Sequence, residues 1–167
     1  MKKCNFLFIP FFSCLVIASC TKDRTPTGID AELFSKAQKE DLKYFNDYQE
    51  SSKETGHKST YFRRRYNALA EASVDSSESI NLNVFQEGSM IVYEMNSINK
   101  GKGEKFAIMF KDKTSEYKDQ KGWVWSYVNA DNTIIEPASR KGISCISCHS
   151  SDNSTLMSTY STGEEKK

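Results

Sequence analysis

Three consecutive segments with alternating side chains constrain the fold of this chain most. Alternate residues fall on opposite faces in "GSMIVYEMNS", "KFAIMFKD" and "GWVWSYVN", which cover Met90–Met95, Phe106–Lys111 and Trp123–Val128. This period of two is typical of β-strands. Polar connections join the segments, and the tight-turn sequence "ADN" follows the third, before "TII". Three strands in succession with polar connections predict an antiparallel sheet.

Two further segments predict helices. "DAELFSKAQKEDLKYFNDYQE" begins at Asp30 and spaces its apolar residues mostly three to five positions apart, as in an amphipathic helix. Asp30 is predicted to cap the start of this helix, and Gly56 to end the region. "SRKGISCISCHSSD" has no strand alternation and is predicted to be a loop that enters a short helix. The fold class is therefore α+β, mainly antiparallel sheet, with an N-terminal amphipathic helix and a short helix near the C-terminus.

The first 20 residues have the anatomy of an export signal. Lys2 and Lys3 precede a mostly apolar run that is too short to span a bilayer as a helix. The run ends in "IASC", which resembles the lipobox of bacterial lipoproteins, where cleavage precedes the cysteine and its thiol carries the lipid. Cys20 is therefore the predicted lipidation site, and residues 1–19 the signal peptide. The alternatives are a buried N-terminal helix and an ordinary signal peptide without lipid.

The lipobox interpretation simplifies the use of the five cysteines. Cys4 and Cys14 leave with the signal, Cys20 carries the lipid, and Cys145 and Cys148 remain in the folded domain. We expect a polar tether over residues 20–30, one domain over 31–160 and a disordered tail over 161–167. Without Lys2 and Lys3, 21 basic residues face 22 acidic ones, a net charge of −1. This balance gives no basis for binding nucleic acid, which needs a concentrated basic surface.

The segment Cys145-Ile-Ser-Cys148-His149 matches C-x-x-C-H, the attachment motif of c-type haem. Two thiols one helical turn apart can reach the two vinyl groups of a haem, and the next residue supplies the proximal imidazole to iron. We therefore predict one covalent haem c on Cys145 and Cys148, with His149 as iron ligand, and the C-terminal helix as the haem-attachment helix. The alternatives are a redox C-x-x-C pair and a zinc site. The first lacks a βαβ context, and the second has few ligands available.

Several motifs, in this order, resemble the cytochrome P460 family, whose relatives include the β-sheet cytochromes c′. They are "HKSTYFRRRYN", "FQEGSMIVYEM", "KFAIMFKD", "GWVWSYVNADN" and "CISCH", and the resemblance covers about residues 31–160. It implies a largely antiparallel sheet, a homodimer, and a haem with an open or nearly open distal side. Family members of the P460 type oxidise hydroxylamine and carry a lysine–haem cross-link, whereas the cytochromes c′ lack the cross-link and bind nitric oxide. Here Tyr93 stands where many members have lysine, Lys58 follows His57 in place of glycine, and Gln86 replaces a proline.

The distal side of the haem has four candidate residues: Arg64, Arg65, Glu94 and Tyr93. In a strand, Arg64 faces the side opposite to Arg63 and Arg65. One of these arginines lies over the haem pocket, or the run forms a solvent-exposed edge of the sheet. Glu94 is either a proton acceptor in the pocket or a surface or interface carboxylate. His57 is a further candidate ligand, although its neighbours predict exposure. A sixth ligand from a methionine is another possibility, with four candidates: Met90, Met95, Met109 and Met157.

Three functions remain open from the sequence. The first is oxidation of small nitrogen compounds such as hydroxylamine at an open haem, and the second is binding of a gas such as nitric oxide at the same site. The third is electron transfer by a six-coordinate haem, because a filled sixth position favours electron transfer. Each is compatible with a redox partner protein. We expect an extracytoplasmic protein that meets the membrane through its lipid only. Thr21 follows the lipid cysteine, and the absence of aspartate there favours the outer membrane.

Overall fold

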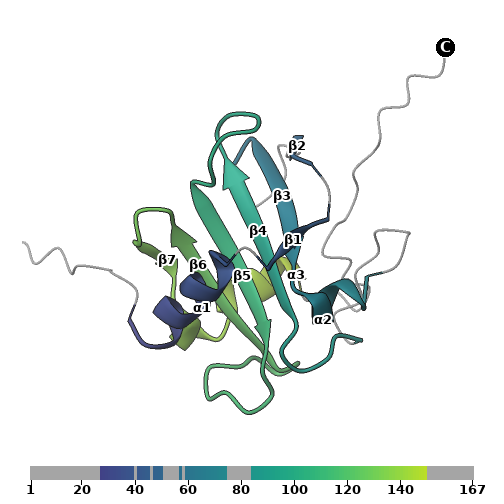
Figure 1. Ribbon diagram of the computed structural model, residues 1–167. Coiled ribbons are helices and arrows are strands. Elements are labelled where there is room, and N and C mark those ends of the chain that lie inside the picture. The colour runs from purple at the N-terminus through teal and green to yellow at the C-terminus, as the bar shows by residue number, and fades with distance from the viewer. Residues whose placement is uncertain are drawn as a thin grey trace, which may run out of the picture.

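Seven antiparallel strands form one sheet in the computed structural model, which describes residues 27–39, 41–45, 47–50, 57, 59–74 and 84–149 (Figure 1). The sheet order is β1-β3-β4-β5-β6-β7, and β2 also pairs with β3. The structure confirms the predicted α+β fold, and the predicted signal peptide, Cys20 and C-terminal tail lie outside the described residues. The strands are β1 Lys43–Tyr44, β2 Gln49–Glu50, β3 Tyr61–Tyr66, β4 Met90–Asn96, β5 Lys105–Lys111, β6 Trp123–Asn129 and β7 Ile134–Glu136.

The three strands predicted from alternation are β4, β5 and β6, and their register fixes which side chains share a row. Tyr93 of β4 pairs with Ala107 of β5, which pairs with Tyr127 of β6. In the next row, Ile91 pairs with Met109, which pairs with Trp125. The predicted turn at "ADN" also forms, because the amide of Asn129 donates to the carbonyl of Thr133 at 2.9 Å.

The N-terminal helix α1 spans Ile29–Ala37, so it is much shorter than the sequence predicts. Its end is fixed by tertiary contacts, because the Arg65 guanidinium donates to the carbonyls of Ala37 and Lys39, each at 2.9 Å. The chain then joins the sheet as β1, antiparallel to β3. The apolar residues after Ala37 keep a helical spacing, but the helix does not continue. The hydrogen bonds from Arg65 and the pairing of β1 with β3 hold the chain in another conformation.

Asp30 does not cap α1, contrary to the prediction. Gly28 holds the N-cap position with a φ of 56° and makes no side-chain capping bond. The Asp30 carboxylate is instead buried and accepts hydrogen bonds from the Ser126 hydroxyl at 2.6 Å and the Ala138 amide at 2.9 Å. Asp30 thus joins α1 to β6 and to the short helix η1, Ala138–Arg140.

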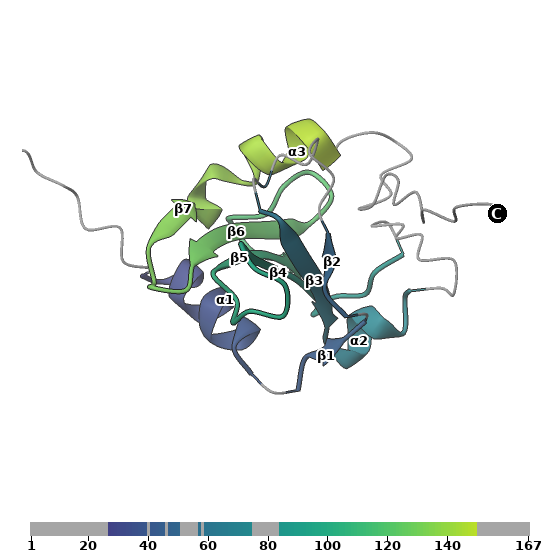
Figure 2. The same ribbon diagram turned by 90° about the horizontal axis from the view of Figure 1, so that it is seen from above.

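Helices cover both faces of the sheet, as seen from above in Figure 2. The α1 face carries α1 and a core that includes Leu33, Val92 and Val124. The opposite face carries the C-terminal helix α3, Ile143–His149, and is called the α3 face. Its core is rich in aromatic residues, and burying one such side chain contributes about 1.5–3 kcal/mol. Buried aromatic members of the α3-face core are Phe62, Tyr66, Phe85, Tyr93, Trp123 and Trp125.

The remaining helix is α2, Ala68–Glu71, which follows β3 directly. Asn67 caps it by accepting a hydrogen bond from the Ala70 amide at 3.0 Å, an arrangement that Asn favours at this position. Over the part of the chain that the structure describes, no helix has the length and apolar character that crossing a bilayer requires.

Candidate haem site

The helix with the C-x-x-C-H motif begins against the sheet at Gly142. Gly142 has a φ of 69°, and its carbonyl accepts the amides of Cys145 and Ile146 at 2.9 and 2.8 Å. A β-carbon at this position would lie 2.4 Å from Cδ1 of Trp125. The positive φ and the close approach of the Trp125 ring both require glycine at this position. Its lack of a side chain lets α3 start in direct contact with that ring.

One side of α3 faces the aromatic α3 face. Cys145 and Ile146 are partly buried and pack against its core. His149 follows four residues later, so it projects on the same side of the helix as Cys145. The ring of His149 lies 5.8 Å from that of Trp125, with 28° between the planes. Cys148 lies in α3, but its side chain is not among those described.

Asp119 holds Trp125 in place beside His149. One carboxylate oxygen of Asp119 accepts the indole N–H of Trp125 at 2.9 Å. The other oxygen accepts the amides of Lys121 and Trp123, each at 2.8 Å. No pattern in the sequence points to Asp119, which lies in the polar connection between β5 and β6.

His57 lies on the same face, close to His149. The centres of the two imidazole rings are 6.2 Å apart, with 38° between their planes. His57 also stacks on Tyr93 at 6.4 Å and 12°, and meets Tyr127 edge-on at 5.7 Å. The expectation that His57 is exposed was wrong, because it is half-buried among these rings.

Burial keeps both imidazoles neutral. Burial and, to a smaller extent, the nearby His57 lower the pKa of His149 to about 4. Burial also lowers the pKa of His57 below its usual value. A neutral imidazole has a free lone pair for a metal, so near pH 7 both rings are able to act as ligands. A cysteine and a neutral imidazole on one side of a helix, above an aromatic surface, fit a covalently attached haem.

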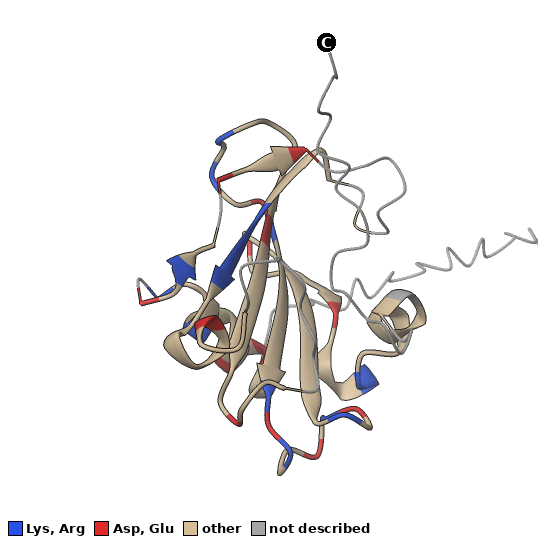
Figure 3. Cartoon of the chain, turned by 90° about the vertical axis from the view of Figure 1, so that its right-hand side faces the viewer, with Lys and Arg blue, Asp and Glu red and all other residues tan. Residues whose placement is uncertain are grey.

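The sheet separates the four distal candidates into two pairs. Arg64 and Tyr93 lie on the α3 face, where Arg64 is fully buried and its guanidinium carbon is 4.9 Å from the centre of the Phe45 ring. Arg65 and Glu94 face the other way. A haem held by α3 is therefore next to the first pair and screened by the sheet from the second. In Figure 3 the strands are mostly uncharged, and the basic run of β3 is the long blue stretch.

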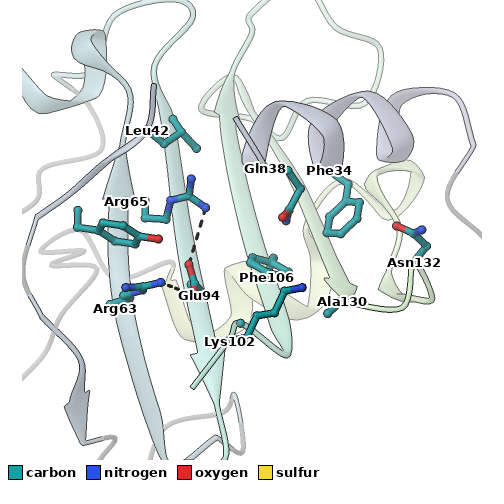
Figure 4. Close-up of a pocket in the computed structure, with 12 residues that line it drawn as sticks. Phe34, Gln38, Leu42, Arg63, Arg65, Glu94, Lys102, Phe106, Ala130 and Asn132 are labelled. Atoms are coloured by element: carbon teal, nitrogen blue, oxygen red, sulfur yellow. Dashed lines mark hydrogen bonds and ion pairs between the residues drawn. The ribbon is translucent and has the colours of Figure 1, made fainter. Parts of the chain in front are cut away.

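Arg65 and Glu94 instead line a pocket of about 570 Å³ on the α1 face (Figure 4). Glu94 is buried and forms ion pairs with Arg63 at 2.7 Å and Arg65 at 3.7 Å. It also accepts a hydrogen bond from the Tyr48 hydroxyl at 2.7 Å. The buried carboxylate is thus matched by two cations and a hydroxyl, which is how proteins stabilise a buried charge.

The methionines proposed as sixth ligands lie in different places. Met90 belongs to the core of the α1 face. Met95 and Met109 are buried in the α3 face, where the sulfur of Met95 lies 3.9 Å from the hydroxyl of Tyr127. Met157 lies outside the described residues.

Comparison with known proteins identifies one family. The family model Cytochrome P460 matches residues 40–157, a span that contains the sheet and α3. No curated protein matches the chain.

Proposed function

Because the chain belongs to the cytochrome P460 family, whose members bind one covalent c-type haem, we propose that Cys145 and Cys148 carry this haem. His149 is the proximal ligand of iron. The observation that carries the assignment is the placement of Cys145 and neutral His149 on one side of α3, over the α3 face. Bound there, the haem supplies a metal that exchanges electrons and binds small molecules.

The chain's own residues orient this site. Trp125, fixed by Asp119, packs beside the His149 ring and limits its rotation. Tyr93 and Arg64 are buried on the same face, so they are the two distal candidates on the haem side of the sheet. Members of the family are extracytoplasmic, and their chemistry is related to hydroxylamine. We therefore propose that the substrate or ligand is a small nitrogen compound, such as hydroxylamine or nitric oxide.

An electron-transfer cytochrome is the second candidate function. It requires a second axial ligand, and His57, only 6.2 Å from His149, is the observation that favours it. Turnover of hydroxylamine with an artificial electron acceptor separates an enzyme from a gas-binding protein or an electron carrier. Both hydroxylamine oxidation and electron transfer require a partner protein that exchanges electrons with the haem. We propose that the protein assembles as a homodimer.

The proposed location is the outer membrane, with the protein anchored by lipid on Cys20. The support is the lipobox-like sequence before Cys20 and Thr21 after it. Replacing Cys20 with alanine should release the protein from the membrane fraction and leave its absorption spectrum unchanged. If the variant stays with the membranes, the anchor lies elsewhere.

The test of haem attachment is expression of the full chain in a bacterium with c-type haem maturation. We expect a red protein whose peptide mass includes one haem and whose haem stays bound after denaturation. The double change Cys145→Ser and Cys148→Ser should abolish the covalent haem. The matched variant Ser147→Ala lies between the two cysteines and should retain it. A colourless wild-type protein at its bare polypeptide mass would overturn the proposal.

A further inference from the structure

The position of His57 opposite His149 has no role in haem attachment. His57 and His149 come from distant parts of the chain, yet their rings are 6.2 Å apart on the α3 face. Tyr93 and Tyr127 enclose the His57 ring from two sides, one by stacking and one edge-on. These two tyrosines flank Ala107 in one row of the sheet, so the small residue leaves room between them.

The spacing of the two rings matches that of two ligands on one metal. Imidazoles that bind iron from opposite sides have their centres roughly 6 Å apart, since each metal–nitrogen bond is about 2 Å long. Both ring planes must then contain the coordination axis, and the observed angle of 38° between them is compatible with this. Direct packing alone would favour stacked or edge-on contact, and the tilted pair is neither.

We propose that His57 is the second axial ligand of the haem iron in the resting protein. The proposal rests on the proposed function, because it assumes that His149 is the first. Under this proposal, His57 controls access to the iron, because a small nitrogen compound must displace His57 in order to bind. The Tyr93 and Tyr127 rings hold the displaced His57 nearby. The resting protein therefore favours electron exchange and admits a ligand only when His57 leaves.

Other described residues on this face fit the sixth position less well. The sulfur of Met95 is buried in the core and lies against the Tyr127 hydroxyl. Met109 is also buried in the core, in the same row of the sheet as Trp125. Tyr93 stacks on His57, so an approach of its hydroxyl to iron would disrupt that pair.

The test is the ferric spectrum of the full-length holoprotein, purified without imidazole or a histidine tag. Ligation by His57 predicts low-spin iron in electron paramagnetic resonance, and a near-infrared magnetic circular dichroism band of bis-histidine type. His57→Gly should convert the iron to high spin, and added imidazole should restore the low-spin spectrum. Met95→Leu is the matched control and should stay low-spin. His57→Gln is a second variant if His57→Gly does not accumulate.

Ligand kinetics give an independent readout. If the iron is open in under about a tenth of the wild-type molecules, cyanide association should be at least about tenfold slower in the wild type than in His57→Gly. A wild-type holoprotein with high-spin, five-coordinate iron overturns the role of His57 and leaves haem attachment standing. Low-spin iron that persists in His57→Gly also overturns it. Absence of covalent haem overturns the proposed function itself.

Discussion

At the scale of single residues, Gly142 is required both by its positive φ and by its close packing against Trp125. We expect Gly142→Ala to destabilise the start of α3, because a left-handed φ costs an alanine about 1–2 kcal/mol. Overlap of the new β-carbon with the Trp125 ring adds about 1–3 kcal/mol. Urea unfolding of the apoprotein measures the total, and the yield of covalent haem shows whether α3 still presents its thiol.

Gly28 provides the control for this substitution. It also has a positive φ, of 56°, but a β-carbon there would meet nothing within 4 Å. Gly28→Ala should therefore show the backbone cost alone and keep the haem yield of the wild type. Equal haem yields in the two variants would show that contact with Trp125 contributes nothing to the placement of α3.

The sequence predicts some of these residues and not others. The C-x-x-C-H motif identifies Cys145 and His149 because the residues that define it are adjacent in the chain. His57 reaches the same site only through tertiary structure, which leaves no local pattern. Asp119 lies only six residues before Trp125, but a single aspartate in a polar connection carries no pattern of its own. The prediction that Glu94 faces either the pocket or the surface misses its real position, since the buried ion pair with Arg63 depends on β3 lying beside β4.

At the scale of elements, Glu94 joins β3, β4 and the segment before β2. Glu94→Gln should cost about 2 kcal/mol, less than a fully buried pair because the Arg63 side chain is 22% exposed. Glu71→Gln, which breaks an exposed pair with Lys43, should cost under about 1 kcal/mol. Chemical denaturation checks both, and the haem spectrum should not change. An altered spectrum in Glu94→Gln would mean that the two faces of the sheet are coupled.

Tyr48, next to β2, makes stability depend on alkaline pH. Burial and a hydrogen bond to Glu94 raise the pKa of Tyr48 to about 12, and burial raises the pKa of Tyr127 to about 12. Above pH 10 the unfolded chain loses these protons while the folded chain keeps them, so stability falls as pH rises from 10 to 12. Below pH 10 both tyrosines are protonated in the folded and the unfolded chain, so their contribution to stability does not change with pH.

Tyr48→Phe tests this dependence. The variant should lose about 1 kcal/mol at pH 7 through its missing hydrogen bonds. Between pH 10 and 12 its stability should fall less steeply than that of the wild type, with Tyr127 responsible for the remainder. Unfolding curves at a series of pH values measure the slope, and identical slopes would contradict the assignment.

Among the elements, strands were predicted better than helices. β4, β5 and β6 were located with the correct faces because each has a full period-two pattern and both faces are buried. The N-terminal helix was predicted to continue past Ala37 because Leu42 and Phe45 keep a helical spacing. Two-residue strands such as β1 carry no pattern of their own and form only because β3 offers a free edge.

At the scale of the whole molecule, Asp30 connects the two ends of the described chain. Asp30→Ala leaves two buried donors without their acceptor, and hydrogen bonds to a charged group contribute about 1.5–3 kcal/mol each, so we expect a loss of about 3 kcal/mol. Asp30→Asn keeps an acceptor oxygen and should lose less. Glu32→Ala, on the exposed side of α1, should cost under about 1 kcal/mol. A loss in Asp30→Ala no larger than in Glu32→Ala would refute this role.

The order of strands in the sheet also has a consequence for biogenesis. From β3 to β7 each strand pairs with the next one along the chain, and α3 is the last element described. A polypeptide exported from its N-terminus can thus complete the sheet before the two thiols emerge, and such local pairing is fast. If haem is attached to Cys145 and Cys148 as proposed, its attachment then competes with docking of α3 for access to the cysteines. The rate at which the protein turns red should therefore rise when that docking is weakened.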